Sequence, residues 1–592
     1  MPGRWCPIFR GSPRALLAGA LAIVGVGAWL AMRSPLAERA AAAFARGGQW
    51  AALKIEHPLD GAVFPPDLAP PTITWKPGSP DGDAWVVRIE SSTGAELLLA
   101  SCGERKYRPR RDLWEKVKGV GPDTPVRVRV LEIGRSAPER ILAAGSVALR
   151  FAREPVDAPV FYRDVPLPFQ YAVCNPSTIR WRLGDLSEET PAPVVLEDLP
   201  VCGNCHSFSK DGKVLGLDVD YGNDKGSYAM VPVFAETAID RNHIFSWAQY
   251  RPEDKMTTLG LLSQVSPDGR HVVSTVKDRS VFVPRDDLTY SQLFFPIKGI
   301  LVDYHPATKV FTPIRGADDP ALVQSNPTFS PDGKTIYFAR AKAVRMSVED
   351  EQKGVFMPME LVPEFLTGKR GFQFDIYRVP YNGGKGGRAE PVKGASHNGM
   401  SNYFPRVSPD GRWLVFNQAR NFMLLQPDST LYIMPTAGGA PRKMTCNLPS
   451  MNSWHSWSPN GRWLVFSSKL RGPYTDLWLT HIDENGQDAP PVLLERLSVE
   501  GRAANIPEFV NARPGSLKRI VHRFLDDANF VHQGLVVELM ADWESAARAY
   551  EKALSIKAGD VAARLSLARA YLALGRLADA ERELKVVLGQ QP

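Results

Sequence analysis

Cysteine is scarce in this sequence, and its scarcity excludes a fold that depends on disulfide bonds. The 592 residues include six cysteines, whereas secreted domains built on disulfides are far richer in them. Cys202 and Cys205 form a Cys-x-x-Cys pair, and the others are scattered at Cys6, Cys102, Cys174 and Cys446. A structural zinc site needs four ligands, and no second Cys-x-x-Cys or Cys/His pair completes one. The sequence therefore argues against a zinc domain as well.

A strong charge of one sign is also missing. The chain has 71 lysines and arginines against 64 acidic residues, and the net charge of +7 is spread along it. A nucleic-acid-binding domain concentrates its basic residues on one face or in one segment. We therefore expect no nucleic-acid partner.

The nucleophile motif of propeller-bearing serine peptidases is absent too. Those enzymes carry Gly-x-Ser-x-Gly in an α/β domain, and this sequence contains no such motif. We therefore expect no peptidase and name no catalytic residue. The reduction of a small molecule at a haem is the enzymatic hypothesis that stays open, because an open coordination position at iron is not visible in a sequence.

Long hydrophobic runs are rare, and the one that matters lies near the N-terminus. Ala15 to Met32 is an uncharged run of 18 residues, which spans about 27 Å as a helix. Three arginines and no acidic residue precede it, which places the N-terminus in the cytoplasm. We predict an uncleaved signal anchor over residues 1–35, with inner-membrane attachment and the bulk of the chain in the periplasm. The alternative is cleavage near Ala40 to Ala43 and release into the periplasm.

Between residues 54 and 152, short β-prone runs alternate with turns rich in proline and glycine. Examples are Thr72 to Trp75 and Ala84 to Ile89. This pattern predicts a small β-sandwich with Trp75 in its core. The segment resembles a fibronectin type III or immunoglobulin-like module, and we expect it to act as a spacer.

A short turn motif occurs five times along the chain. It first appears as Ser209-Lys210-Asp211-Gly212-Lys213, and later copies begin at Ser266, Ser330, Ser408 and Ser458. Its Asp-Gly or Asn-Gly supplies the positive φ of a tight turn between two strands. The steps of 57, 64, 78 and 50 residues are too long for helix-pair repeats and suit four-stranded propeller blades.

These repeats predict the fold class. We expect a mainly β protein with an α-helical tail, in which residues 156–507 form a six-bladed β-propeller, with seven blades as the alternative. Residues 166–199 are expected to form a degenerate first blade. The motif resembles the repeats of TolB-like, WD-related bacterial propellers, and that resemblance implies an export-side interaction platform. Trp454 to Trp463 resembles a subgroup that couples this propeller to a tetratricopeptide tail.

The tail over residues 529–592 repeats at 34 residues. Trp543 matches Leu577 and Tyr550 matches Leu584 at this step, which is the tetratricopeptide period. Two repeats are fewer than the three that usually stand alone. We therefore expect the tail to dock on the propeller or on a protein partner.

Cys202-x-x-Cys205-His206 matches the attachment pattern of c-type haem. Two thiols at this spacing add to the vinyl groups of the haem, and the histidine that follows ligates the iron. TolB-like proteins carry no such motif, so the prediction rests on Cys202, Cys205 and His206 alone. We expect one covalent haem c. The alternatives are a redox or structural cysteine pair, zinc, or no role.

A second iron ligand is predicted by aligning the repeats on their turns. His206 then lies over His455. Residues just before the inner strand of a blade tend to face the central channel, so we expect both histidines to point toward the axis and to share one iron. Competing ligands are His397, Met400 and Met451. The structural alternative is that His455 simply packs beside Trp457.

Two functions follow from these patterns. The first is a membrane-anchored, periplasm-facing propeller with one haem that acts in electron transfer or redox sensing within a protein complex. The second is a non-enzymatic interaction platform without haem. In both, protein partners bind through the propeller face and the tail.

Overall fold

The computed structural model describes residues 34–589, apart from 202, 222–223, 286, 353 and 540. The predicted signal anchor, Ala15 to Met32, lies outside these residues. Over the described ranges, no helix is long and apolar enough to cross a membrane. Backbone contacts divide the chain into two compact units, Met1–Pro66 with Pro70–Arg153, and Asp67–Ala69 with Glu154–Pro592.

The first unit is built on two β-sheets. Trp75 is 2% exposed and lies 6.2 Å from Trp85 between ring centroids, which confirms its predicted burial. The larger sheet has the order β1-β9-β8-β5-β6, with β3 beside β9, and the smaller has the order β2-β4-β7. Their bounds are β1 (Ala51–Ala52), β2 (Lys54–His57), β3 (Ala62–Phe64), β4 (Ile73–Lys76), β5 (Ala84–Ser91), β6 (Glu96–Cys102), β7 (Lys106–Tyr107), β8 (Val126–Gly134) and β9 (Ala137–Phe151).

Among the described residues of this unit, the α-helices are α2 (Pro35–Ala45) and α3 (Arg111–Lys118). In α2, small residues form a buried face that packs on residues of the larger sheet; the cluster includes Ala37, Ala40, Ala43, Val86, Leu131 and Ile133. Alanine side chains allow the helix to approach the sheet closely. The small residues considered above as a cleavage site are therefore part of a packed helix.

The second unit begins with strands that pair in groups of four. In the described part of the chain there are six such antiparallel groups, of which the third and fourth are joined by one parallel pairing, Gly299 with Val323. The first group is β34 (Arg502–Phe509), β10 (Val160–Pro166), β11 (Arg180–Gly184) and β12 (Val194–Leu196), and the second is β13 (Gly203–Phe208), β14 (Val214–Val219), β15 (Ser227–Pro232) and β17 (Ile244–Ser246). The third group is β18 (Leu261–Val265), β19 (Val272–Pro284), β20 (Gln292–His305) and β21 (Val310–Pro313), and the fourth is β22 (Leu322–Phe329), β23 (Thr335–Lys342), β24 (Asp375–Pro380) and β25 (Glu390–Pro391). The fifth group is β26 (Ser401–Val407), β27 (Trp413–Ala419), β28 (Thr430–Pro435) and β29 (Arg442–Lys443), and the sixth is β30 (Asn452–Trp457), β31 (Trp463–Ser468), β32 (Asp476–His481) and β33 (Val492–Leu493).

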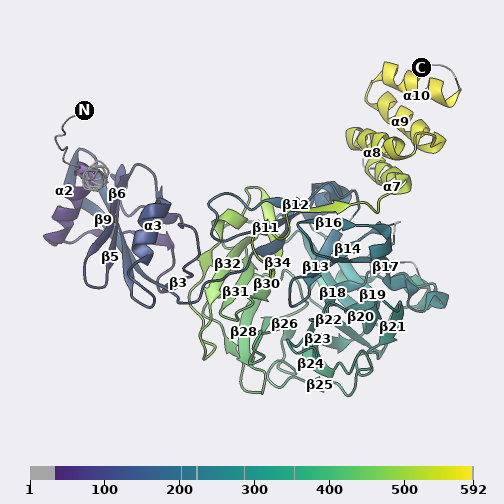
Figure 1. Ribbon diagram of the computed structural model, residues 1–592, viewed down its shortest axis with the longest axis horizontal. Helices are drawn as coiled ribbons and strands as arrows, with labels where there is room; N and C mark the ends of the chain where they lie inside the picture. The colour runs from purple at the N-terminus through teal and green to yellow at the C-terminus, as the bar shows by residue number, and fades with distance from the viewer. Residues whose placement is uncertain are drawn as a thin grey trace, which may run out of the picture. The chain divides into compact units, whose positions relative to one another are not determined.

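The first strand of each group contacts the first strand of the next. These contacts run β13, β18, β22, β26, β30, β34 and back to β13, so they form a closed ring, and the labels of these strands follow one another in that order in Figure 1. The region inside this ring is called the central channel below. β34 comes from the end of the region and pairs with β10 at its start, with Val160 opposite Phe509. This is the arrangement of a β-propeller.

The repeated motif forms the turn between the first two strands of a group. Its glycine has a φ of 69° at Gly212 and 76° at Gly411, which confirms the predicted left-handed turn. In one copy Ser330 Oγ donates to Asp332 Oδ1 at 2.6 Å, and the Lys334 N–H donates to the same oxygen at 3.1 Å. The sequence therefore closes each turn through its own side chains.

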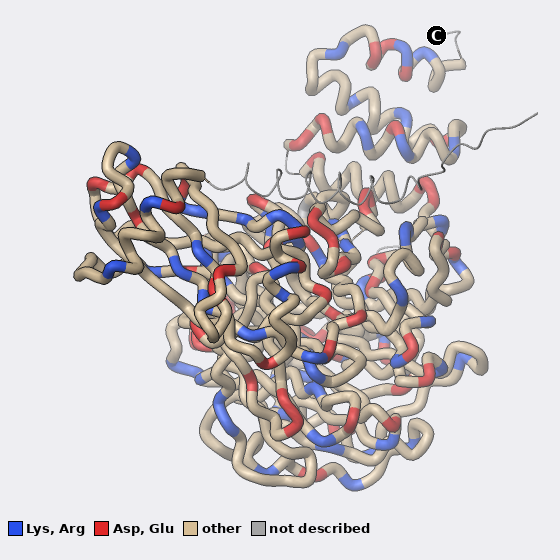
Figure 2. The backbone as a smooth tube through the Cα atoms, turned by 60° about the vertical axis from the view of Figure 1, so that its left-hand side comes forward, with Lys and Arg blue, Asp and Glu red and all other residues tan. Residues whose placement is uncertain are grey.

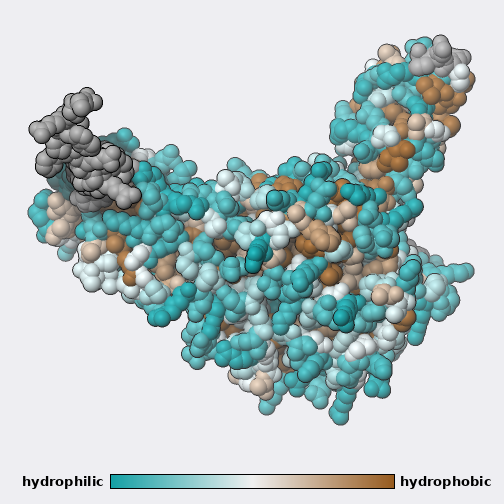
Figure 3. Space-filling model, in the orientation of Figure 1, coloured by the Kyte–Doolittle hydropathy of each residue, from teal (hydrophilic) through white to brown (hydrophobic). Residues whose placement is uncertain are grey.

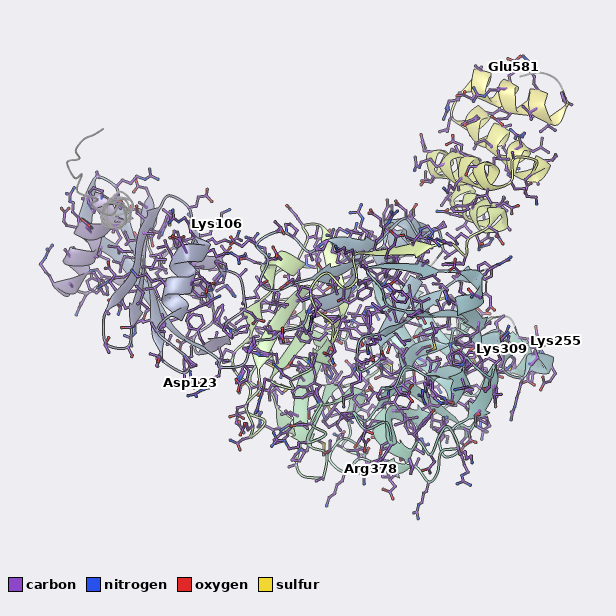
Figure 4. The ribbon with its side chains drawn as sticks, viewed as in Figure 1. Lys106, Asp123, Lys255, Lys309, Arg378 and Glu581 are labelled. Carbon is purple, nitrogen blue, oxygen red and sulfur yellow. The ribbon has the colours of Figure 1, made fainter. Side chains whose placement is uncertain are left out.

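Smaller elements complete the second unit. β16 (Glu236–Ile239) pairs with β35 (Arg519–His522) in parallel. The short helices are α4 (Phe169–Cys174), α5 (Val348–Gln352) and α6 (Pro363–Leu366). Acidic and basic residues are interspersed along the backbone without a face of one sign in view (Figure 2). Charged side chains such as Lys309 and Arg378 project outward from the edge of the propeller (Figure 4).

Over the described part of the tail there are four helices, drawn in yellow in Figure 1. They are α7 (Asp527–Glu538), α8 (Trp543–Ile556), α9 (Val561–Ala573) and α10 (Leu577–Val587). Tyr550, Ala553, Leu567 and Ala570 belong to their common core. A Cβ on Gly534 would lie 2.4 Å from the Tyr550 ring, so α7 and α8 approach closely at that glycine. The chain is thus mainly β with a helical tail, as predicted.

Candidate functional site

The predicted haem attachment motif lies at the start of β13. Cys202 is outside the described residues, whereas Cys205 and His206 are both in the strand. The pairing of β13 with β14 shifts register between Gly203 and His206, which marks a β-bulge. Asn204 and Cys205 line a cavity that His206 does not line. Because a bulge re-aims side chains in this way, Cys205 and His206 face different surroundings.

Cys205 is a buried free thiol next to an acidic side chain. Its backbone N–H donates to Asp218 Oδ2 at 3.0 Å. Burial raises the pKa of the Cys205 thiol well above its usual value, and the Asp218 carboxyl acts in the same direction. Burial also raises the pKa of Asp218 to about 7. The thiol is therefore protonated at neutral pH and is a poor nucleophile.

His206 is buried against an aromatic ring of the preceding strand group. Its ring lies 4.6 Å from the Phe161 ring in an edge-to-face arrangement. Neither ring nitrogen has a hydrogen-bond partner within the described ranges. Burial lowers the pKa of His206 to about 3, and the positive charge of Arg163 adds to that effect. His206 is therefore neutral in the folded protein.

His455 occupies the equivalent position in β30, and its neighbours are different from those of His206. Its Nε2 lies 3.2 Å from the carbonyl oxygen of Val415 in β27. Burial lowers its pKa to about 3. Each histidine therefore packs against the strand group that precedes its own. His206 contacts Phe161 in β10, and His455 contacts Val415 in β27. These contacts do not support a shared iron, which stays a prediction from the repeat alignment.

Covalent haem requires the second cysteine and the histidine after it to face the same macrocycle. Cys205 faces a cavity and His206 faces Phe161, so these residues, as β13 holds them, do not fit the group. Covalent haem at Cys202, Cys205 and His206 stays a prediction from the motif.

The competing ligands are dispersed. His397 Nδ1 lies 3.0 Å from Asp375 Oδ2 on the surface, Met400 is partly exposed, and Met451 is fully buried. Among the residues that can be described, no three His, Cys, Asp or Glu side chains are grouped so that they could hold a metal ion.

The cavity beside Cys205 has a volume of about 250 Å³. It lies where β13, β18 and β34 begin, and Leu262, Ile506 and Trp454 are among its apolar lining residues. Lys469 also lines it. Sequence reasoning missed Lys469, because nothing in the run Ser467-Ser468-Lys469 distinguishes it from an ordinary surface lysine.

A second cavity of about 220 Å³ lies at the other end of the channel. Prolines of the repeated turns line it, and a half-buried arginine, Arg406, joins three strand groups there. Arg406 Nη1 donates to Gln264 Oε1 at 2.6 Å and to Thr328 Oγ1 at 2.7 Å. Glu508 accepts from the Phe208 N–H at 2.9 Å, and burial raises its pKa to about 7. These groups are engaged with the protein itself, so we assign them a structural role.

Comparisons with known proteins bear on the tail and on little else. The family model of the tetratricopeptide repeat matches residues 540–592, which confirms the predicted repeats. No curated protein matches the chain in sequence. A TolB-type protein of Agrobacterium tumefaciens is 17% identical, with a TM-score of 0.31, over 57% of this chain and 88% of its own. A gluconolactonase of Xanthomonas campestris is 15% identical, with a TM-score of 0.29, over 57% of this chain and 84% of its own. Similarity at these TM-scores supports no statement about function.

Proposed function

We propose that this protein is a protein-interaction platform whose tetratricopeptide tail binds a partner through apolar side chains on α7 and α9. The observation that carries the proposal is that these two helices present apolar residues on both faces. Exposed apolar residues that gather on one surface of a folded protein mark sites of interaction. Tetratricopeptide arrays use their extended concave surface for binding.

Helix α9 has the clearest second face. One side is buried in the tail core through Ala563, Leu567 and Ala570. Leu565 and Leu572 are 45% and 52% exposed. A spacing of seven residues places these two on one face.

Helix α7 adds to this surface at its C-terminal end. Leu535 and Leu539, the residue that directly follows α7, are both exposed, and their spacing of four places them on one side of this helix end. Hydrophobic residues are visible on the surface of the C-terminal helices in Figure 3. The apolar surface formed by Leu535, Leu539, Leu565 and Leu572 is hereafter the tail surface.

The proposal places this platform on the periplasmic side of the inner membrane. The uncharged run Ala15 to Met32 and the arginines before it support that location. The packing of α2 supports an uncleaved chain, because removing the residues up to 44 would uncover Val86 and Leu131.

The experiment compares the wild-type chain with the double variant Leu565→Glu, Leu572→Glu. Each is cross-linked in cells and purified from membranes, and the bound proteins are quantified by mass spectrometry. We expect a defined partner to fall at least tenfold in the double variant, because two carboxylates on the tail surface oppose apolar contact. The matched control is Glu581→Lys, a charge change at an exposed site of α10 (Figure 4). If the bound proteins are the same for all three chains, the proposal is wrong.

A further inference from the structure

The cavity beside Cys205 is a built site that the interaction proposal does not use. Its volume of about 250 Å³ is slightly below the usual range for small-molecule sites, which begins at about 300 Å³. Its walls are mostly apolar and come from several strand groups; they include Phe169, Leu262, Phe282, Phe294, Leu424 and Trp454. A cavity of this size with such walls favours a small ligand with an apolar body.

Most charged groups of the wall already have partners inside the protein. Asp220 forms an ion pair with Lys225. Asp218 accepts the Cys205 N–H at 3.0 Å. Arg163 donates to the Asn204 side chain and lies over the Phe169 ring, 5.6 Å from its centroid. Each of these groups therefore has at least one partner inside the protein.

Lys469 is different. Its side chain is 7% exposed, and its Nζ donates to the Pro473 carbonyl oxygen. The Nζ also lies 5.8 Å from the centroid of the Tyr290 ring, on its face. Among the described residues, Lys469 forms no ion pair with an acidic side chain, although the charge of Asp287 acts on its ammonium from a greater distance. An ammonium removed from water without a counterion is costly to bury.

We propose that this cavity binds a small apolar monocarboxylate, such as a medium-chain aliphatic or an aromatic acid, with its carboxylate on Lys469. Lys469 has no ion-pair partner within the part of the chain that the structure describes, so its single charge matches one negative charge. A phosphate dianion would bring a second charge into an apolar wall. The carboxylate supplies a counterion to Lys469, and the apolar body fills the space toward Leu262 and Phe294. A charge-assisted hydrogen bond in such surroundings is stronger than a neutral one.

The first test uses three ligands with the same eight-carbon chain. Octanoate, octan-1-ol and octylamine are titrated into the full chain by isothermal calorimetry. We expect octanoate to bind at least tenfold more tightly than octan-1-ol, and octylamine to show no measurable binding. Equal affinity for octanoate and octan-1-ol, or binding of none of the three, overturns the proposal.

Two variants locate the charge that discriminates among the ligands. Lys469→Met removes it, so the ratio of octanoate to octan-1-ol affinity is expected to fall to about one. Lys469→Arg keeps the charge and is expected to keep a preference for octanoate. The matched control is Lys210→Met, because Lys210 also donates to a proline carbonyl, that of Pro331, but lines the cavity at the other end of the channel. If Lys469→Met retains the tenfold preference, Lys469 is not the ligand and the proposal fails.

A third measurement needs no substitution. Burial lowers the pKa of Lys469 to about 8, and the charge of Asp287 opposes this shift. Tyr290 is another titratable group that faces its ammonium. Octanoate affinity is therefore expected to fall as pH rises from 7 to 9.5, while octan-1-ol affinity stays constant. An octanoate affinity that does not change over this range contradicts a carboxylate on Lys469.

Discussion

A buried carboxylate joins the two ends of the propeller, and its removal gives the sharpest test of the closure. Asp164 lies in β10 and its side chain is 2% exposed. Its Oδ2 accepts from Arg182 Nε at 2.5 Å, and its Oδ1 accepts from Arg502 Nε in β34. Arg502 also donates to the carbonyl oxygen of Thr178. Asp164 is therefore the counterion that two arginines share where the last strand pairs with the first.

Asp164→Asn keeps the shape of the side chain and removes its charge. The side chains of Arg182 and Arg502 are 9% and 17% exposed, so both guanidinium groups would stay largely out of water without a carboxylate. Breaking a buried ion pair in this way costs about 3–5 kcal/mol of the free energy of unfolding. For a region of roughly 350 residues, that corresponds to a fall in Tm of about 5 °C.

The assay is equilibrium unfolding in urea, followed by tryptophan fluorescence, with a thermal scan as a second measure. The matched control is Glu484→Gln, which removes the charge from the ion pair between Arg462 and Glu484 at 2.5 Å. Glu484 is 75% exposed, and exposed pairs contribute about 0–1 kcal/mol. If Asp164→Asn is within about 1 kcal/mol of the control, the argument that this carboxylate holds the closing strand is refuted.

Three further predictions concern the turns, a histidine and the haem motif. Asp332→Ala should lower the free energy of unfolding by about 1 kcal/mol, whereas Asp332→Asn should change it little, because Asn460 accepts the same two hydrogen bonds in the fifth turn. Hydrogen bonds from Ser330 and the Lys334 N–H lower the pKa of Asp332. The contribution of Asp332 to the free energy of unfolding is therefore present above about pH 4 and disappears as pH falls through the lowered pKa. If urea unfolding shows the same effect of Asp332→Ala at pH 2 and at pH 7, this prediction is contradicted. The hydrogen bond with Asp303 raises the pKa of His271. The difference in the free energy of unfolding between wild type and His271→Gln should therefore be largest below about pH 6 and shrink as pH rises past that raised pKa. A difference that grows with pH would count against an ion pair between His271 and Asp303. For exported protein, the placement of Cys205 and His206 on different sides of β13 predicts no c-type band in a pyridine haemochrome spectrum; a band that Cys205→Ala abolishes would show that β13 rearranges around a haem.

Local patterns were enough to predict much of the architecture. The Asp-Gly turns were predictable because five or six consecutive residues close each one, as Ser330 and Asp332 do. The helical tail was predictable because the 34-residue step places alanines and Tyr550 at packing positions within neighbouring helices. Both signals depend on contacts between residues close in sequence, which a periodic pattern records directly.

The candidate site depended on contacts that no local pattern records. The sequence places Cys205 beside His206, but the register of β13 against β14 decided that they face different surroundings. Nothing around Lys469 indicates burial, and only the convergence of several strand groups on the channel removes its ammonium from water. Asp164 meets Arg502 across 338 residues of chain. The sequence alone therefore determined the repeating units, and the tertiary structure decided which charges are buried, because burial depends on which distant strands become neighbours.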